Sequence, residues 1–391
     1  MATTGLTAQS VGARDSEALA DHLGRALLVA VIVGCVLFVL QWPIAALGFA
    51  WLEGSAEVEA LARDYVAIRF WSAPATLCNY ALLGWFIGLG RARVALALQL
   101  VLNLTNIVLD VVFVVGLGWG VQGVAAGSLI AEVVATVVGL RLAAGVLRGH
   151  GVALSWRRVR SPAALRHTLA VNADIMVRSL SLMAVFLWFT AQGARHGDLV
   201  LAANALLMQL VGVASYVLDG VAFAAETLTG QAVGARDPAR LRRVVTLSSA
   251  WAGFAALLLT GLFLLAGEDL IALLTTDPAL RQLARTYLPW AACVPIAGVT
   301  AFQLDGVFIG ATRAPAMRNA MLQSLVVFAV AWWLLRPWAN HGLWAALYAH
   351  YAARTVTLLA RYPALARVAH HNPASHHPAV SAPTSPSSPS S

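Results

Sequence analysis

Six acidic residues lie within long apolar stretches of the sequence, where a charged side chain is costly and therefore points to chemistry. They are Asp110, Glu132, Asp174, Asp219, Glu226 and Asp305. A carboxylate at the centre of a bilayer costs about 3 kcal/mol on insertion scales. Each acid therefore needs a partner, a water-filled cavity or a proton. Because burial favours the neutral form of a carboxyl group, such a residue can take up and release protons near neutral pH.

One of these acids has a polar companion at helical spacing. Asn106 precedes Asp110 by four residues, which places both on one face of a helix. An asparagine side chain both donates and accepts hydrogen bonds, so it can hold the carboxyl group in either protonation state. We expect this pair to couple transport to a proton or another cation. A structural hydrogen bond between helices is the alternative interpretation.

A second group of polar residues occurs in the later part of the chain. Asp219 and Glu226 are seven residues apart, or two turns on one helix face, and Tyr216 lies about one turn before Asp219. Together with Asp305 they are expected to line a cavity that couples transport or attracts cationic substrates. For Glu226 the alternative is that it caps or orients a nearby turn.

The remaining charged residues within apolar stretches favour structural roles. Asp174 and Arg178 are spaced i, i+4 with the acid first, which predicts a neutralised structural pair. Arg69 and Arg354 lie near the ends of apolar stretches and are expected to extend toward water. Glu132 is compatible with a polar network or with a purely structural contact.

Composition indicates an integral membrane protein. Of the 391 residues 60% are hydrophobic and 11% are charged, whereas a soluble domain carries about 25% charged residues. Ten stretches are long and apolar enough to cross a bilayer as helices, the secondary structure that satisfies its own backbone in lipid. They cover residues 26–47, 70–89, 94–117, 121–140, 165–189, 199–228, 244–266, 288–311, 317–335 and 343–359.

The arginines are distributed unequally over alternate loops. One set of loops holds 18 arginines and the other holds five, which predicts that the Arg-rich loops and the C-terminal tail are cytoplasmic. The net charge of +8 therefore reflects topology, and we expect no nucleic-acid partner. The three cysteines lie in apolar stretches, and no metal-binding spacing is present.

An internal repeat with an offset of 222 residues divides the chain into two halves. Residues 9–15 (QSVGARD) match residues 231–237 (QAVGARD), and residues 84–92 match 306–314. An even number of spans separates equivalent positions, so both halves share one orientation. We expect a first lobe at 1–141, a cytoplasmic linker at 142–162, a second lobe of six helices at 163–362 and a disordered tail rich in His, Pro and Ser at 363–391.

The repeat also predicts how a complete first half would begin. The second half starts near residue 162, so its counterpart would start about 60 residues before Met1. We therefore expect the first helix and most of the second to be missing from this sequence. A natural ten-helix protein is the alternative.

Several motifs together resemble the multidrug and toxic compound extrusion (MATE) family, in particular a DinF-like branch. The paired motifs are residues 5–13 (GLTAQSVGA) and 226–235 (ETLTGQAVGA). Residues 106–110 (NIVLD), 174–180 (DIMVRSL) and 304–313 (LDGVFIGATR) support them. The resemblance runs from Thr3 to about Tyr362. Each motif is weak alone, but the set is specific.

The resemblance implies an all-α membrane protein of the MATE type (MOP superfamily), with about ten of an expected twelve transmembrane helices in two lobes around a cavity. It implies a monomeric antiporter in the inner membrane that exports small amphipathic, cationic compounds and uses no cofactor beyond a proton or sodium gradient. Protons are favoured over sodium. By resemblance Ser128 joins Asn106 and Asp110 at the coupling site. The acidic residue that the family carries on its first helix is missing here.

Other functions remain as alternatives. A lipid or polysaccharide flippase shares this fold, but anionic substrates favour basic cavities, and acids outnumber arginines within these spans. A non-functional truncated transporter is a further alternative. An enzyme is disfavoured because the spans contain no nucleophile elbow, no zinc spacing and no paired acidic metal motif.

Overall fold

Long helices make up the computed structural model, which describes residues 2–50 and 55–368. Within these ranges no β-strand is present. The α-helices are α1 (Ala2–Gly12), α2 (Ser16–Val39), α3 (Gln41–Ala50), α4 (Ala56–Arg69), α5 (Ala73–Gly88), α6 (Ala92–Asp110), α7 (Gly120–Gly149), α8 (Trp156–Val159), α9 (Pro162–Ala194), α10 (Asp198–Gly234), α11 (Pro238–Leu274), α12 (Pro278–Gly310), α13 (Ala314–Leu335) and α14 (Ala339–Val368).

Eight segments of the described chain are long and apolar enough to cross a membrane. One of them, Ala314–Leu365, contains both α13 and α14, which a short 3₁₀ turn at Arg336–Trp338 joins. Helix α5 is only 16 residues long and is preceded by the 3₁₀ turn Phe70–Ser72. A helix therefore occupies each of the ten stretches predicted to span the membrane.

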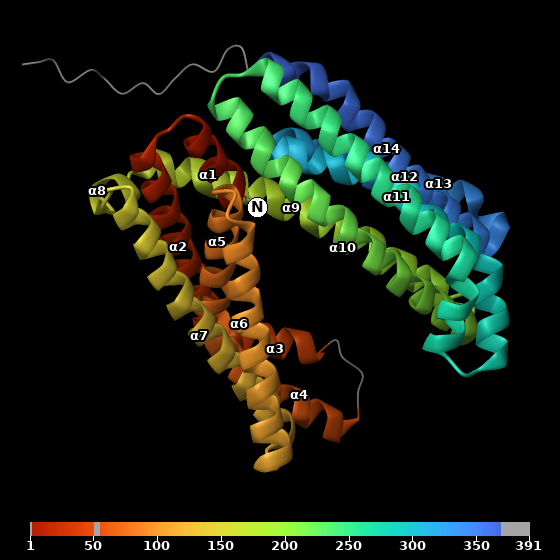
Figure 1. Ribbon diagram of the computed structural model, residues 1–391. Coiled ribbons are helices and arrows are strands. Elements are labelled where there is room, and N and C mark those ends of the chain that lie inside the picture. Colours follow the sequence, from red (N-terminus) through yellow and green to blue (C-terminus); the bar gives the residue numbers. More distant parts are fainter. Residues whose placement is uncertain (1, 51–54, 369–391) are drawn as a thin grey trace, which may run out of the picture.

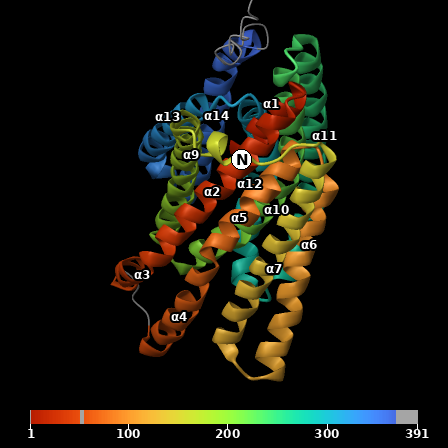
Figure 2. The same cartoon turned by 90° about the vertical axis from the view of Figure 1, so that its left-hand side faces the viewer.

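The helices form two lobes that touch at one end. Helices α1 to α7 form the first lobe and α9 to α14 the second, with the short α8 between them (Figure 1). The two lobes lie together where α1 packs against α10 and α12, and their ribbons diverge toward the other end (Figure 1). In the view rotated by 90°, α2, α5, α6 and α7 run side by side, and α3 and α4 lie at the lower left (Figure 2). Helix α4 packs against α7.

The predicted repeat is confirmed in three dimensions. Asp15 and Asp237 are equivalent positions, and each caps the helix that follows it. Asp15 Oδ1 accepts from the backbone N of Ala18 at 2.9 Å, and Asp237 Oδ1 accepts from the backbone N of Arg240 at 2.8 Å. The preceding residues, Arg14 and Arg236, both have left-handed φ values, of 57° and 54°.

Glycines allow the two lobes to meet almost backbone to backbone at this end, which we call the lobe contact. It joins α1 of the first lobe to α10 and α12 of the second, and α5 to α10. A Cβ atom at Gly12 would lie 2.8 Å from the carbonyl carbon of Gln231. Its equivalent Gly234 would place a Cβ atom 2.7 Å from the carbonyl carbon of Gln9. Because real Cβ atoms do not approach so closely, only glycine fits at both positions.

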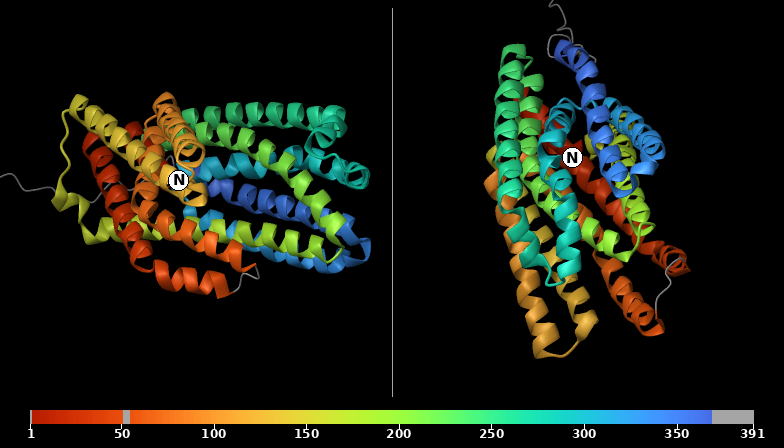
Figure 3. Two further views of the ribbon diagram at one scale, coloured as in Figure 1. Left: turned by 90° about the horizontal axis from the view of Figure 1, so that it is seen from below. Right: turned by 90° about the vertical axis from the view of Figure 1, so that its right-hand side faces the viewer.

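Side chains close the same contact. Gln9 Nε2 donates to the backbone O of Gly310 at 3.0 Å and to Thr312 Oγ1 at 3.1 Å. Thr227 Oγ1 donates to the backbone O of Ile87 at 3.0 Å. Viewed from below, the long helices of the second lobe, in green to blue, run roughly side by side, and the connection through α8 joins the lobes in sequence (Figure 3).

Several boundaries differ from the sequence prediction. Helix α7 continues through the first part of the predicted linker to Gly149, and α14 continues past Pro363 to Val368. The rest of the predicted tail, residues 369–391, lies outside the described residues. The first predicted span begins earlier, at Ser16, because Asp15 caps it. It also ends earlier, at Val39, and α3 then begins with Pro43 in its first turn.

The substitution Gly234→Leu is expected to loosen the lobe contact. Overpacking of this kind costs about 1–3 kcal/mol, and about 1.4 kcal/mol corresponds to a factor of ten. A cysteine that replaces the buried Ser10 should therefore react about tenfold faster with a water-soluble maleimide than it does without the leucine. The background protein would lack the three native cysteines. Gly253→Leu is the matched control, because nothing lies within 4 Å of a Cβ atom there. Equal labelling of the Gly234→Leu protein and the control would contradict this role.

Candidate functional site

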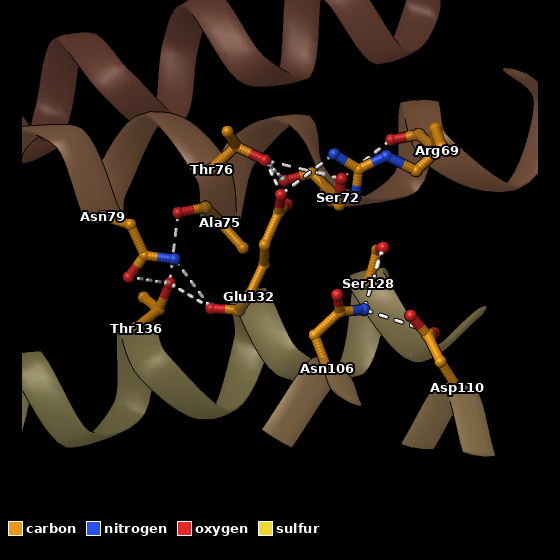
Figure 4. Close-up of polar contacts among 10 residues, drawn as sticks. All are labelled: Arg69, Ser72, Ala75, Thr76, Asn79, Asn106, Asp110, Ser128, Glu132 and Thr136. Carbon is orange, nitrogen blue, oxygen red and sulfur yellow. Dashed lines mark hydrogen bonds and ion pairs between the residues drawn. The ribbon is translucent and has the colours of Figure 1, made fainter. Parts of the chain in front are cut away.

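Helices α6 and α7 bring together the three residues predicted to form the coupling site. Asn106 Nδ2 donates to Asp110 Oδ1 at 3.3 Å and to Ser128 Oγ at 3.1 Å (Figure 4). Asn106 and Asp110 lie on one face of α6, as their spacing predicts, and are half-buried. The asparagine therefore connects a carboxylate on α6 with a hydroxyl group on α7.

The local backbone explains how α7 comes so close to Asp110. A Cβ atom at Gly127 would lie 2.5 Å from Asp110 Oδ1, so a larger residue there would push the carboxylate away. Directly after Asp110 the chain forms a π-helix, Val111–Gly116. Insertions of this type are frequent at functional sites because they change the direction of side chains within a helix.

A second polar network lies beside the first and is centred on Glu132, one turn after Ser128 on α7. Glu132 Oε1 forms an ion pair with Arg69 Nη2 at 3.0 Å and also accepts from Thr76 Oγ1 through its other oxygen (Figure 4). Asn79 Nδ2 donates to the backbone O of Glu132 at 2.9 Å. The expectation that Arg69 extends toward water is therefore wrong, because a buried acid on α7 binds it.

The second lobe contains a cluster of charged residues that sequence spacing did not reveal. Asp305 on α12 accepts hydrogen bonds from Arg178 on α9 and from Arg354 on α14. All three side chains are buried, and Arg354 is only 1% exposed. Arg354 is thus an interior residue, contrary to the expectation that it extends to the membrane surface. It also lies over the ring of Phe302, 5.6 Å from its centre.

The predicted pair of Asp174 and Arg178 is not formed. Arg178 binds Asp305, and Asp174 Oδ1 instead accepts from Arg318 Nη1 on α13 at 2.6 Å. Spacing i, i+4 contributes only a few tenths of a kcal/mol. Ion pairs with residues on neighbouring helices therefore outcompete it where a buried charge needs a partner.

Arg178, Asp305 and Arg354 form what we call the arginine cluster, which has a net positive charge. Two guanidinium groups share one carboxylate, and three of their N–H groups, Nε of Arg178 and Nε and Nη1 of Arg354, have no hydrogen-bond partner within residues 2–50 and 55–368. Asp219 on α10 is near enough to the cluster to interact electrostatically with it. The sequence predicted that Asp305 lines an acidic cavity, but two basic side chains, Arg178 and Arg354, bind this residue.

The other residues predicted for the second lobe lie in different surroundings. Tyr216 is 79% exposed on the surface of α10, and Asp219 is half-buried. Glu226 is only 1% exposed, and the next residue, Thr227, donates a hydrogen bond to Ile87 of the first lobe. Glu226 therefore belongs to the region where the lobes meet and lies apart from the Asp305 cluster. In the described ranges no group of three or more His, Cys, Asp or Glu side chains could hold a metal ion.

Comparisons with known proteins agree on one family. The model of the family described as MatE matches residues 1–112 and 175–334. The chain is 43% identical over 361 residues to DNA damage-inducible protein F of Escherichia coli (strain K12), which covers 92% of this chain and 78% of that protein. It is 28% identical to the probable multidrug resistance protein NorM of Aromatoleum aromaticum over 71% of this chain and 61% of that protein.

Solved structures show the same fold. A crystal structure of MATE in complex with MaL6 matches with a TM-score of 0.85 at 20% identity, covering 94% of this chain and 84% of that one. A second structure, described as the outward-facing conformation of a multidrug resistance MATE family transporter of the MOP superfamily, also has a TM-score of 0.85, at 19% identity over 94% of this chain and 83% of that chain. The two-lobed, all-helical architecture expected from the sequence is therefore confirmed.

The arginine cluster predicts an order of stability among its variants. Asp305→Asn leaves two buried guanidinium groups without a carboxylate, and breaking a buried pair in this way costs about 3–5 kcal/mol. Arg354→Gln leaves the pair of Asp305 and Arg178 intact and should be milder. Thermal unfolding in detergent would measure both, with Asp269→Asn at an exposed position as the control. If Arg354→Gln lowered the Tm more than Asp305→Asn, the shared carboxylate would not be the centre of the cluster.

Proposed function

The chain belongs to the MatE family, and from this we propose that it is a secondary active exporter of small toxic compounds driven by cation antiport. In this proposal protons are the coupling ions and Asp110 is the group that takes up and releases them. The observation that carries the proposal is the half-buried contact of Asp110 with Asn106 and, through it, with Ser128.

The hydrogen bond from the Asn106 amide to Asp110 is compatible with protons as the coupling ions. Hard cations are bound by oxygen ligands. At this site the amide nitrogen of Asn106 faces both Asp110 Oδ1 and Ser128 Oγ. This donor stabilises the ionised carboxylate, and a protonated carboxyl group can in turn donate to a neighbouring acceptor. The site can therefore hold either protonation state without a metal ligand shell.

The lobe contact supports an alternating-access cycle. The lobes are held together at the end where α1 meets α10, and their ribbons diverge at the other end (Figure 1). One of the similar structures is described as outward-facing. We propose that the closed end is cytoplasmic, since it carries the Arg-rich loops, and that the protein lies in the inner membrane. Rocking of the two lobes about this contact would then expose the interior alternately to either side.

The substrates proposed are small, amphipathic and cationic. Relatives of this chain are named as multidrug resistance proteins. Asp219 on α10 provides negative charge that is half-buried and forms no ion pair with the described residues. A monomer contains both lobes and is therefore sufficient for the proposed cycle.

Asp110→Asn is expected to abolish coupled export, because an amide cannot exchange a proton. Proteoliposomes with a pH gradient would report export of a fluorescent cationic dye, and the variant should match liposomes without protein. Dye binding, followed by fluorescence polarisation, should be retained, which separates coupling from binding. Asp198→Asn, at an exposed position on α10, is the control. Transport at the wild-type rate by Asp110→Asn would refute the assignment, and export driven by sodium alone would refute the choice of protons.

A flippase for anionic lipids or glycolipids is a second candidate. The observation that favours it is the excess positive charge of the Arg178–Asp305–Arg354 cluster, since basic interiors suit anionic substrates. It predicts that the protein moves a fluorescent anionic lipid between leaflets, measured by quenching with dithionite. Arg178→Gln would then slow this movement while Asp198→Asn would not. If fluorescent lipid is protected equally with and without protein, the flippase is excluded.

A further inference from the structure

A long apolar groove runs between α10 and α11. Its volume is about 910 Å³. The walls are apolar side chains that include Val221, Leu228, Leu247, Trp251 and Leu258. Trp251 and Leu258 are 65% and 63% exposed, so these side chains have no protein cover among the described residues. Exposed apolar surface of this extent in a membrane protein is suited to a hydrocarbon chain.

The groove has one charged end. Arg240 and Arg243, in the first turns of α11, lie at this end, and no other charged residue lines the groove. Along α11 the distance from Arg243 to Leu258 is about 22 Å at the rise of an α-helix. One leaflet of a bilayer is about 15 Å thick in its hydrocarbon part. The groove therefore has the length and polarity of a single lipid molecule, with the arginines at the level of a headgroup.

The two arginines have no acidic partner in the described chain. Arg240 Nη2 donates to Gln231 Oε1 at 3.1 Å, and the side chain of Arg243 makes no hydrogen bond or ion pair with the described residues. Guanidinium groups bind phosphate oxygens in a bidentate manner, and they are weakly hydrated. Their charge is complementary to an anionic phosphate headgroup.

The internal repeat provides an independent argument. Arg243 is equivalent to Asp21 of the first lobe at the offset of 222 residues. Asp21 is bound by the chain itself, since Arg158 Nε of the linker forms an ion pair with Asp21 Oδ2 at 3.1 Å. Beside it, the side chains of Val159 and Leu154 pack against Gly24. The first lobe thus covers this position with a basic, apolar segment.

The second lobe has the opposite charge at the equivalent position and no covering segment among the described residues. A partner that covers this position as the linker covers Asp21 would therefore be acidic and apolar. We propose that the groove between α10 and α11 binds one anionic phospholipid of the leaflet that faces the Arg-rich loops, with the phosphate at Arg240 and Arg243 and one acyl chain along Trp251 and Leu258. The lipid has a structural role and is not transported, so the inference does not depend on the proposed export.

The test compares lipid binding by native mass spectrometry of the whole purified chain. Phosphatidylglycerol and phosphatidylcholine would be titrated separately into delipidated protein. We expect one phosphatidylglycerol to bind and to be retained on activation. Arg243→Gln should weaken phosphatidylglycerol binding about fivefold, because each basic residue near an anionic membrane surface strengthens binding by about that factor. The Arg240→Gln/Arg243→Gln protein should bind it at least about twentyfold more weakly. Phosphatidylcholine binding should remain unchanged.

Two further variants make the test specific. Arg242→Gln removes an equal charge from the next position on α11, outside the groove, and should leave phosphatidylglycerol binding unchanged. Ala224→Phe narrows the groove at an exposed position and should reduce binding with all arginines present. Equal losses in Arg242→Gln and Arg243→Gln, or unaltered binding in the double variant, would overturn the proposal. A stable dimer that excludes lipid from the groove would do so as well.

Discussion

The burial of ionisable side chains between apolar helices is the constraint on which the rest of this structure depends. A charge within the bilayer must be paired, hydrated or neutralised. In the first lobe Arg69 on α4 and Glu132 on α7 neutralise each other. In the second lobe Asp305 lies between two arginines from α9 and α14. These pairs fix which helices are neighbours, because each joins elements that are distant in sequence.

The two lobes share one framework but have exchanged their charges. The glycines of the lobe contact and the capping aspartates of α2 and α11 occur at equivalent positions in both halves. The polar sites do not. The repeat offset matches Asp110 with Trp332, Ser128 with His350 and Glu132 with Arg354. The buried acid of one lobe is thus the buried base of the other, and each has recruited the opposite charge from a neighbouring helix. Among the described residues, Asp110 of the first lobe is a carboxylate that forms no ion pair and accepts a hydrogen bond from an amide.

The sequence was sufficient for features that depend on neighbouring residues or on the repeat. Hydrophobic length predicted the spanning helices, and the four-residue spacing of Asn106 and Asp110 predicted their hydrogen bond. Ion pairs between distant helices were not predictable in this way. Arg178 has an acid four residues before it, yet it binds Asp305 on another helix, since local spacing cannot show which helices pack together. Arg354 was expected at the membrane surface, although an arginine in an apolar stretch without an acid at helical spacing is the kind of signal that could have indicated its tertiary pair with Asp305.

Helix α5 joins the proposed proton site to the lobe contact. Near its beginning, Thr76 and Asn79 hydrogen-bond to Glu132, which is one turn from Ser128 on α7. At its other end, Gly88 packs against α1, and the backbone O of Ile87 accepts from Thr227 on α10. An element that has contacts with both of two distant sites can carry coupling between them. A shift of α7 on protonation of Asp110 would move one end of α5, and the glycine contacts leave little space at the other end. The displacement would therefore be passed to α1 and α10, where the lobes meet.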